Sequence, residues 1–392
     1  MLESDRGTIL TGAVLALAAT LPVSIAGVNC LAVALTALLL WMNSSGDRLP
    51  WRAVATPFSA WLLAYFCVAI VVSAAGVDPA TSWPMLHKDL HKLWLTALLL
   101  AALPLADRKR LWPALGTGFT LIAAAGIAQT LLLRMPDGTM IRAHAFVHPV
   151  TYGEILSLGF LGAACLRGLG EKAPPKKALD AFLVLSGAAL FLNQTRGALL
   201  GLFVGLLALA CGDKRLRRLA LFAVAGLPLV LALWELLPNN HTIAQMVIRS
   251  REPGPNGALA RLILWRVGWD IFRSHPWLGA GPGNYRTLFT HYFQGVLDGQ
   301  RVWGSAHNLY IHQAAERGLL GLAALGGLLA TMTWRAWRRV QSAATPLNLW
   351  AFSCCMAFLA MNLTEVAFQN EQVMSLLLFI WCLAESASGH LI

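Results

Sequence analysis

Long apolar runs recur along nearly the whole chain, and they constrain the fold more than any other feature. Each run has roughly 15–22 residues, which is the length an α-helix needs to cross the hydrocarbon core of a bilayer. Of the 392 residues, 57% are hydrophobic and only 12% are charged, about half the charge of an ordinary soluble protein. The runs are continuous rather than alternating, so the sequence predicts an all-α integral membrane protein.

About twelve spans can be placed, each long enough or nearly long enough for a bilayer. They divide the chain into residues 1–237 with spans one to nine, a polar segment at 238–306, and residues 307–392 with spans ten to twelve. The expected spans are Thr8–Ala26, Val28–Trp41, Val54–Ala75, Leu93–Leu105, Leu111–Leu133, Val150–Leu166, Leu179–Leu192, Gly197–Cys211, Leu219–Leu237, His307–Trp334, Leu347–Leu363 and Val373–Ala384.

Basic residues in the connecting loops predict the orientation. With the N-terminus in the cytoplasm, the cytoplasmic segments hold 17 Lys and Arg residues, and the short loops opposite hold five. Short cytoplasmic loops are the ones enriched in Lys and Arg, whereas long loops cross regardless of charge. An even number of spans then leaves both termini in the cytoplasm and the 238–306 segment outside.

The net charge of +11 is therefore an orientation signal, and no nucleic-acid partner is expected. The seven Cys lie mostly inside apolar runs, have no CxxC or zinc spacing, and predict no disulfide framework.

The 238–306 segment is the one long polar stretch, and with its flanks it carries arginines but no lysine. Arginine binds phosphate oxygens through two parallel N–H bonds, which lysine cannot do. The stretch Arg261–Phe272 has helical apolar spacing with arginine on its polar face. The Gly/Pro-rich turn Pro276–Gly283 is either a rigid connector or a loop that cradles phosphate, although no strand precedes it. The arginines are Arg249, Arg251, Arg261, Arg266, Arg273, Arg286 and Arg301.

Further polar groups are predicted on the same outer side. Arg196 lies in a very short loop between two apolar runs, where a charge is costly unless it has a function. The others are His87, Lys88, Asp89, His91 and Lys92 on an expected interfacial helix, and Arg142, His144, His148 and Glu154 around span six.

Three motifs make the chain resemble the O-antigen ligase family, which shares its signature region with O-antigen polymerases. The segment Thr195–Ala198 is similar to the family's Ser/Thr-Arg-Gly-Ala. Arg261, Trp265-Arg266 and then His275–Gly281 resemble its Arg…Trp-Arg…His-Pro-Leu-Gly-x-Gly signature. His307-Asn308, nine residues and Gly318-x-x-Gly321 resemble its ligase motif.

The resemblance implies a GT-C-type glycosyltransferase of the bacterial inner membrane. It would transfer O-antigen from undecaprenyl pyrophosphate to a sugar hydroxyl of lipid A–core oligosaccharide, on the periplasmic face. The partners would be these two glycolipids and the surrounding membrane lipids.

Such a reaction needs a base for the acceptor hydroxyl and cations for the diphosphate. His307 is the expected base, because imidazole titrates near neutral pH. Arg196 and Arg261 are the expected catalytic clamps, with substrate-binding roles for Arg142, Arg266, Asn308 and His312. If His307 and His312 shared one helix, their side chains would point about 140° apart, so both could hardly serve one oxygen. No metal or other cofactor is expected, because arginines can neutralise the leaving diphosphate, and an inverted product follows from direct attack.

Two alternatives remain open. An O-antigen polymerase or a protein O-oligosaccharyltransferase would use the same lipid-linked donor; the second usually has an extra C-terminal domain, which is not expected after span twelve. A transporter or flippase would predict inverted repeats and charges within its spans, and neither is visible in the sequence.

Overall fold

Helices make up the computed structural model, which describes residues 4–47, 49–133, 141–170, 174–218, 221, 224–226, 258–297 and 299–388. Most of span nine lies outside these residues, and so do Arg249 and Arg251. The named α-helices in chain order are α1 (Ser4–Thr20), α2 (Ile25–Ser44), α3 (Pro57–Ala74), α4 (Pro79–Ala102), α5 (Leu111–Leu132), α6 (Pro149–Leu169), α7 (Lys176–Asn193), α8 (Arg196–Gly212), α11 (Ala258–Ser274), α12 (Asn284–Tyr292), α13 (Leu309–Ser342), α14 (Pro346–Met361) and α15 (Glu371–Ser388).

The helix starts follow local sequence signals. Ser24, Thr56, Asp78 and Thr345 accept a hydrogen bond from the backbone N–H of the first turn that follows each of them. Proline stands at the beginning of α3, α4, α6 and α14, where its missing N–H costs nothing. These signals place the starts of α2, α3, α6 and α14 close to those of the predicted spans, whereas α4 begins well before its span.

Span four is longer than expected. The residues before Leu93 continue the same helix back to Pro79, so α4 contains the segment that was expected to be a separate interfacial helix. Asp89 and Lys92 on it are buried, and both belong to an ion network with Arg317 of α13. A buried charge is tolerated when it is paired.

In the part of the chain that the structure describes, five helices are long and apolar enough to cross a membrane. They are α2, α3, α5 with the short turn before it, α6 and α13, while α8 and α14 are apolar but shorter. A helical membrane protein is therefore confirmed as the fold class. A count of twelve spans stays a prediction.

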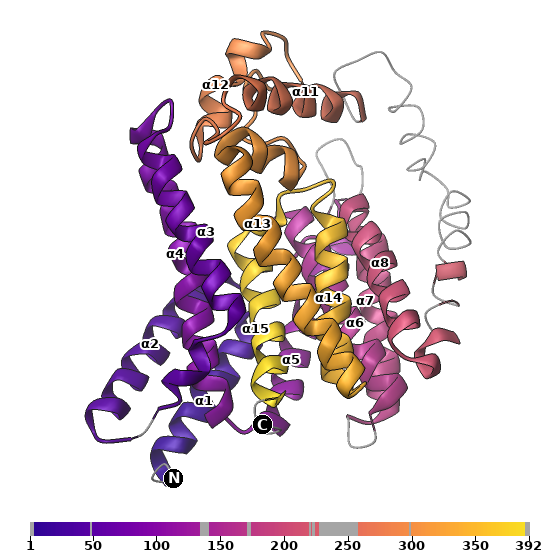
Figure 1. Ribbon diagram of the computed structural model, residues 1–392. Coiled ribbons are helices and arrows are strands. Elements are labelled where there is room, and N and C mark those ends of the chain that lie inside the picture. The colour runs from indigo at the N-terminus through magenta and orange to yellow at the C-terminus, as the bar shows by residue number, and fades with distance from the viewer. Residues whose placement is uncertain are drawn as a thin grey trace.

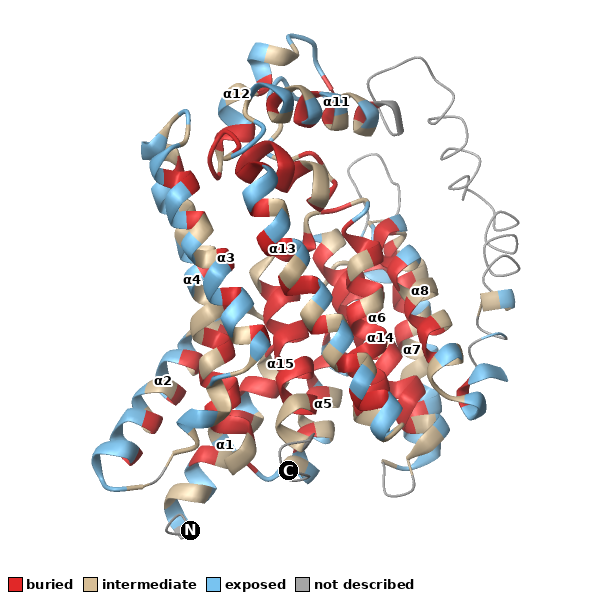
Figure 2. Ribbon diagram, viewed as in Figure 1, coloured by how far each residue is buried: buried red, intermediate tan, exposed pale blue. Residues whose placement is uncertain are grey.

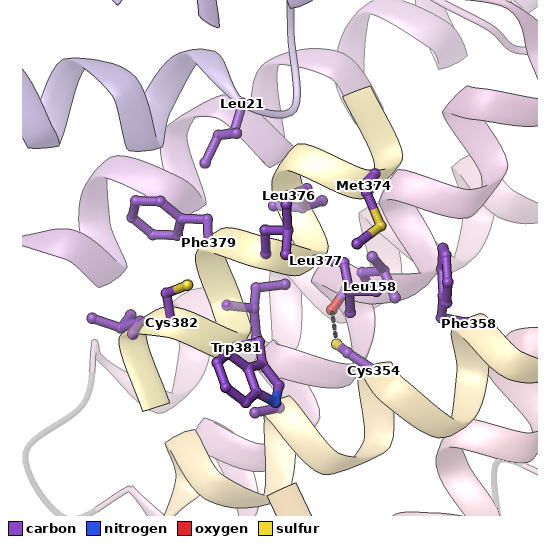
Figure 3. Close-up of a cluster of buried hydrophobic side chains, with 14 of the residues drawn as sticks. Leu21, Leu158, Cys354, Phe358, Met374, Leu376, Leu377, Phe379, Trp381 and Cys382 are labelled. Atoms are coloured by element: carbon purple, nitrogen blue, oxygen red, sulfur yellow. Dashed lines mark hydrogen bonds between the residues drawn. The ribbon is translucent and has the colours of Figure 1, made fainter. Parts of the chain in front are cut away.

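The helical bundle has a buried centre and an apolar outside. Helix α15 is buried on all sides from Val373 to Ala384, and α6 and α14 are almost as enclosed (Figure 2). Around α15, side chains of α1, α6 and α14 form one cluster, in which the Cys354 thiol contacts the carbonyl oxygen of Leu158 (Figure 3). Outer helices instead expose apolar side chains such as Val33, Leu40 and Val71, a surface suited to lipid. All seven cysteines are free, as expected.

Both described ends of the chain lie at one end of the bundle, and α11 and α12 lie across the opposite end (Figure 1). Helix α11 is amphipathic, as predicted: Leu264, Val267 and Ile271 are buried, whereas Arg266 and Trp269 are exposed. Its buried face packs against the first part of α13.

Candidate active site

The predicted base His307 immediately precedes α13. Asn308 is the N-cap of that helix, accepts from the backbone N–H of Ile311 and donates to the carbonyl oxygen of Leu363. The backbone N–H of Leu309 donates to Asn362, so the start of α13 is bound to the loop between α14 and α15. This attachment brings His307 beside Glu365, which lies on that loop.

Glu365 joins two of the predicted site residues. One carboxylate oxygen, Oε2, lies 2.9 Å from Nδ1 of His307. The other, Oε1, accepts a hydrogen bond of 2.8 Å from Nη2 of Arg261 on α11. The Glu365 side chain is only 7% exposed, while those of Arg261 and His307 are 33% and 29% exposed. The carboxylate is thus enclosed, and its two partners are partly exposed.

The loop before α6 and the start of α8 surround the same carboxylate. Arg142 donates through Nε to the carbonyl oxygen of Asn193 and through Nη2 to Oγ1 of Thr195, which fixes it beside the α7–α8 turn. A Cβ added to Gly197 would lie 3.3 Å from Cγ of Glu365, so the first turn of α8, which begins with Arg196, backs the carboxylate. Because Arg142 is largely buried, desolvation lowers its pKa, and the charge of Glu365 opposes that shift. Arg142 and Arg261 therefore lie around Glu365, and Arg196 lies in the helix turn behind that carboxylate, where its charge acts on Arg142.

Three non-glycine residues with left-handed backbone conformation mark this region within the described residues: Ala145, Gln194 and His307. Gln194 ends α7 one residue before Thr195, and Ala145 lies between Arg142 and His148. Such conformations cost about 1–3 kcal/mol each and concentrate where function requires a fixed geometry. The strain lies in the segments that carry the candidate site.

His148 and Glu154 lie close by on α6. His148 caps the helix, and burial together with the charge of Arg142 lowers the pKa of its imidazole. Glu154 is buried in the second turn, and its Oε1 has no hydrogen-bond partner among the described residues. Both interact electrostatically with Glu365.

Two predicted site residues have ion-pair partners outside this group. His312 is buried, lies 3.4 Å from Glu316 and packs against the ring of Tyr285, and it also interacts with Gln369 and His307. Arg266 is 84% exposed and lies 3.8 Å from Asp270 on its own helix. His307 lies before the helix and His312 within it, so the two histidines serve different surroundings.

The Gly/Pro-rich turn is a rigid connector in the structure. Gly318 has φ 60° and ψ −160°, which kinks α13 and frees backbone groups. The turn forms hydrogen bonds with these backbone groups. The N–H of Leu319 donates to the carbonyl oxygen of Pro276, and the N–H of Gly281 donates to the carbonyl oxygen of Glu316. The Glu316 carboxylate accepts from the backbone N–H groups of Gly283 and Tyr285. These glycine-loop N–H groups therefore hold a carboxylate of the chain itself.

Glu365 is the functional residue that sequence reasoning missed. The signal that could have indicated Glu365 is its charge at the end of an apolar run, in a chain of which only 12% of the residues are charged. In the described residues, no group of three or more His, Cys, Asp and Glu side chains could hold a metal ion.

Fold and site together define a class: a helical membrane protein with a histidine–carboxylate pair and converging arginines at one end of its bundle. The family model described as O-antigen ligase matches residues 181–326, from α7 into α13, and confirms the resemblance. The matched segment contains Arg196, Arg261 and His307. No curated protein matches the chain.

Proposed function

We propose that the chain is an O-antigen ligase of the bacterial inner membrane. It transfers an O-antigen chain from undecaprenyl pyrophosphate to a sugar hydroxyl of lipid A–core oligosaccharide, on the periplasmic face. The ligase-domain match supports the family. The observation that carries the chemistry is the pair of bonds from Glu365 to His307 and to Arg261.

His307 acts as the general base. Its Nδ1–H donates to Glu365, which selects the tautomer with a free electron pair on Nε2. Nε2 takes the proton of the acceptor hydroxyl while that oxygen attacks the anomeric carbon. The bond from the anomeric carbon to the diphosphate oxygen breaks, and undecaprenyl pyrophosphate leaves with the electron pair from the opposite face. The new glycosidic bond therefore has inverted configuration, and His307 later releases its proton to water.

Arginines stabilise the leaving diphosphate. Arg196 and Arg261 bind its oxygens, and Arg142 adds positive charge behind them. Thr195, the N-cap of α8, makes no capping bond to the first turn, because its hydroxyl is engaged with Pro149 and Arg142. The N–H groups of that turn and the helix dipole favour an anion at this position. Asn308 supports the start of α13, while Arg266 and His312 act farther from the reacting atoms.

The proposed topology is a GT-C-type arrangement of twelve spans with the site facing the periplasm. The start of α1 and the end of α15 lie opposite α11 and α12, which supports this topology (Figure 1). The excess of basic residues in the predicted cytoplasmic loops supports it too.

An O-antigen polymerase or a protein O-oligosaccharyltransferase is the second candidate, because the donor and the base chemistry would be the same. The three differ in acceptor: lipid A–core, a second lipid-linked O-antigen chain, or a protein.

Reconstitution of the purified protein decides among them. In proteoliposomes with undecaprenyl-pyrophosphate-linked O-antigen, we expect transfer to rough lipopolysaccharide and none to a second donor molecule or to protein. Transfer should persist in EDTA, because arginines supply the positive charge. Loss of activity in EDTA with rescue by Mg²⁺ or Mn²⁺ would show that the arginines are insufficient. Transfer only to lipid-linked glycan or to protein would replace the ligase assignment.

A further inference from the structure

We propose that Glu365 is a positioning residue that couples the donor clamp to the base, so that binding of a lipid diphosphate at Arg261 makes His307 more basic. This inference rests on the proposed function and adds an order to it: the base is fully active only after the donor is bound.

The geometry places one carboxylate between a guanidinium and an imidazole. One oxygen of Glu365 contacts Arg261 at 2.8 Å and the other contacts His307 at 2.9 Å. Arg261 and His307 belong to different elements, since α11 carries the arginine and the start of α13 carries the histidine. Arg261 can thus move without displacing the histidine.

Burial decides which group a substrate can reach. The Glu365 side chain is 7% exposed and is backed by the first turn of α8, so it is fixed. The Arg261 side chain is 33% exposed, which leaves its guanidinium open to an incoming phosphate. A diphosphate can therefore bind Arg261 directly, whereas the enclosed carboxylate of Glu365 is shielded from contact with it.

Other charged groups around Glu365 provide a constant background. Arg142 is anchored to Asn193 and Thr195, and His148 is fixed as the N-cap of α6. Neither of them forms an ion pair with Glu365 among the described residues, whereas Arg261 and His307 do. The charged or titratable groups that interact with Glu365 from the surrounding elements are Arg142, His148, Glu154, Arg261 and His307, and Arg196 lies next to Gly197, which backs the carboxylate.

Sharing weakens each ion pair. A carboxylate that already neutralises a guanidinium stabilises an adjacent imidazolium less than an unshared carboxylate does. Diphosphate oxygens bind arginine through two parallel N–H bonds and compete well with a single carboxylate oxygen. When they draw the guanidinium away, the charge of Glu365 acts on His307 alone. Proton uptake from the acceptor hydroxyl then becomes more favourable.

The test measures the titration of His307 without any transfer reaction. The protein is labelled with ¹³C at the histidine Cε1, and the His307 signal is identified by its loss in His307→Asn. Its titration midpoint is recorded with and without undecaprenyl pyrophosphate, which carries the diphosphate but no sugar. We expect the lipid to raise the midpoint of the wild type by about one pH unit, a tenfold change in proton affinity.

Three variants separate the coupling from the direct effect of a nearby diphosphate. In Arg261→Gln the midpoint should already be raised without lipid, and in Glu365→Gln the lipid should shift it much less than in the wild type. Glu371→Gln is the matched control, because Glu371 contacts a histidine of its own, His87 at 3.3 Å. That control should behave as the wild type does.

Equal lipid-induced shifts in the wild type and in Glu365→Gln would overturn the coupling, and so would an unchanged midpoint in lipid-free Arg261→Gln. None of these measurements needs turnover. Failure of the titration test would therefore reject the coupling without rejecting the ligase function, and failure of the transfer assay would reject the ligase function without rejecting the coupling.

Discussion

At the residue scale, the two histidines near the start of α13 have different roles because their surroundings differ. His307 is partly exposed, paired with Glu365 and packed edge-on against Trp303. His312 is enclosed between Glu316 and Tyr285. The first can meet a substrate hydroxyl; the second holds α13 against α12.

Substitution of each histidine should separate these roles. Asparagine accepts the left-handed backbone of position 307, so His307→Asn removes the base with little added strain. We expect its kcat to fall about 10²–10⁴-fold, as for loss of a general base, while donor lipid still binds. His312→Gln should instead lower the melting temperature and reduce kcat by less than tenfold. Initial rates at saturating substrates and melting curves in detergent measure both effects. A larger loss of kcat in His312→Gln than in His307→Asn would reverse the assignment.

At the element scale, the kink of α13 at Gly318 lets the loop Pro276–Gly283 pair with the helix. The φ and ψ of Gly318 are accessible essentially to glycine alone. Trp277 and Gly279 also approach it closely: a Cβ on Gly318 would lie 2.4 Å from the Trp277 carbonyl carbon. The Gly318-x-x-Gly321 part of the ligase motif is thus explained by backbone geometry next to the site.

Gly318→Ala should therefore destabilise the protein by about 2 kcal/mol or more, from backbone strain and the clash together. Gly326→Ala is the control in the same helix, because nothing lies within 4 Å of a Cβ there. The control should be neutral or slightly stabilising, by up to about 1 kcal/mol. Thermal unfolding of both variants in one detergent gives the comparison. Equal melting temperatures would show that the kink does not require glycine.

At the scale of the whole molecule, the candidate site and the two chain ends lie at opposite ends of the helical bundle. Arg335 and Arg339 near the end of α13 pair with Glu385 near the end of α15, whereas His307 precedes α13 and Glu365 lies in the loop before α15. Helices α11 and α12 lie at the end of the bundle opposite the two chain ends (Figure 1). A bilayer between these ends would place the site on the side opposite the termini.

Cysteine labelling tests this topology. In a variant lacking the seven native cysteines, Ser274→Cys at the end of α11 and Ser342→Cys at the end of α13 are both exposed positions. A membrane-impermeant maleimide applied to intact spheroplasts should label position 274 and should reach position 342 only after lysis. Labelling of both positions from the outside would disprove the proposed orientation.

The sequence alone determined the features that depend on local composition. Apolar runs predicted helices at the observed places in the described residues, and the spacing of Leu264, Val267 and Ile271 predicted an amphipathic α11. The motifs around Arg196, Arg261 and His307 predicted the family, which the domain match confirms. These properties can be inferred locally because hydropathy and capping act over a few neighbouring residues.

Only the tertiary structure decided which residues share the site. Glu365 is 58 residues from His307 and 104 from Arg261, and no local pattern connects them. Their meeting depends on the loop after α14 binding the start of α13, and on α11 folding back over that helix. The same packing turned His312 and Arg266 away, and it revealed that the glycine-rich turn completes a helix kink. Contacts of this kind depend on how whole helices pack, and the sequence specifies them only through the complete fold.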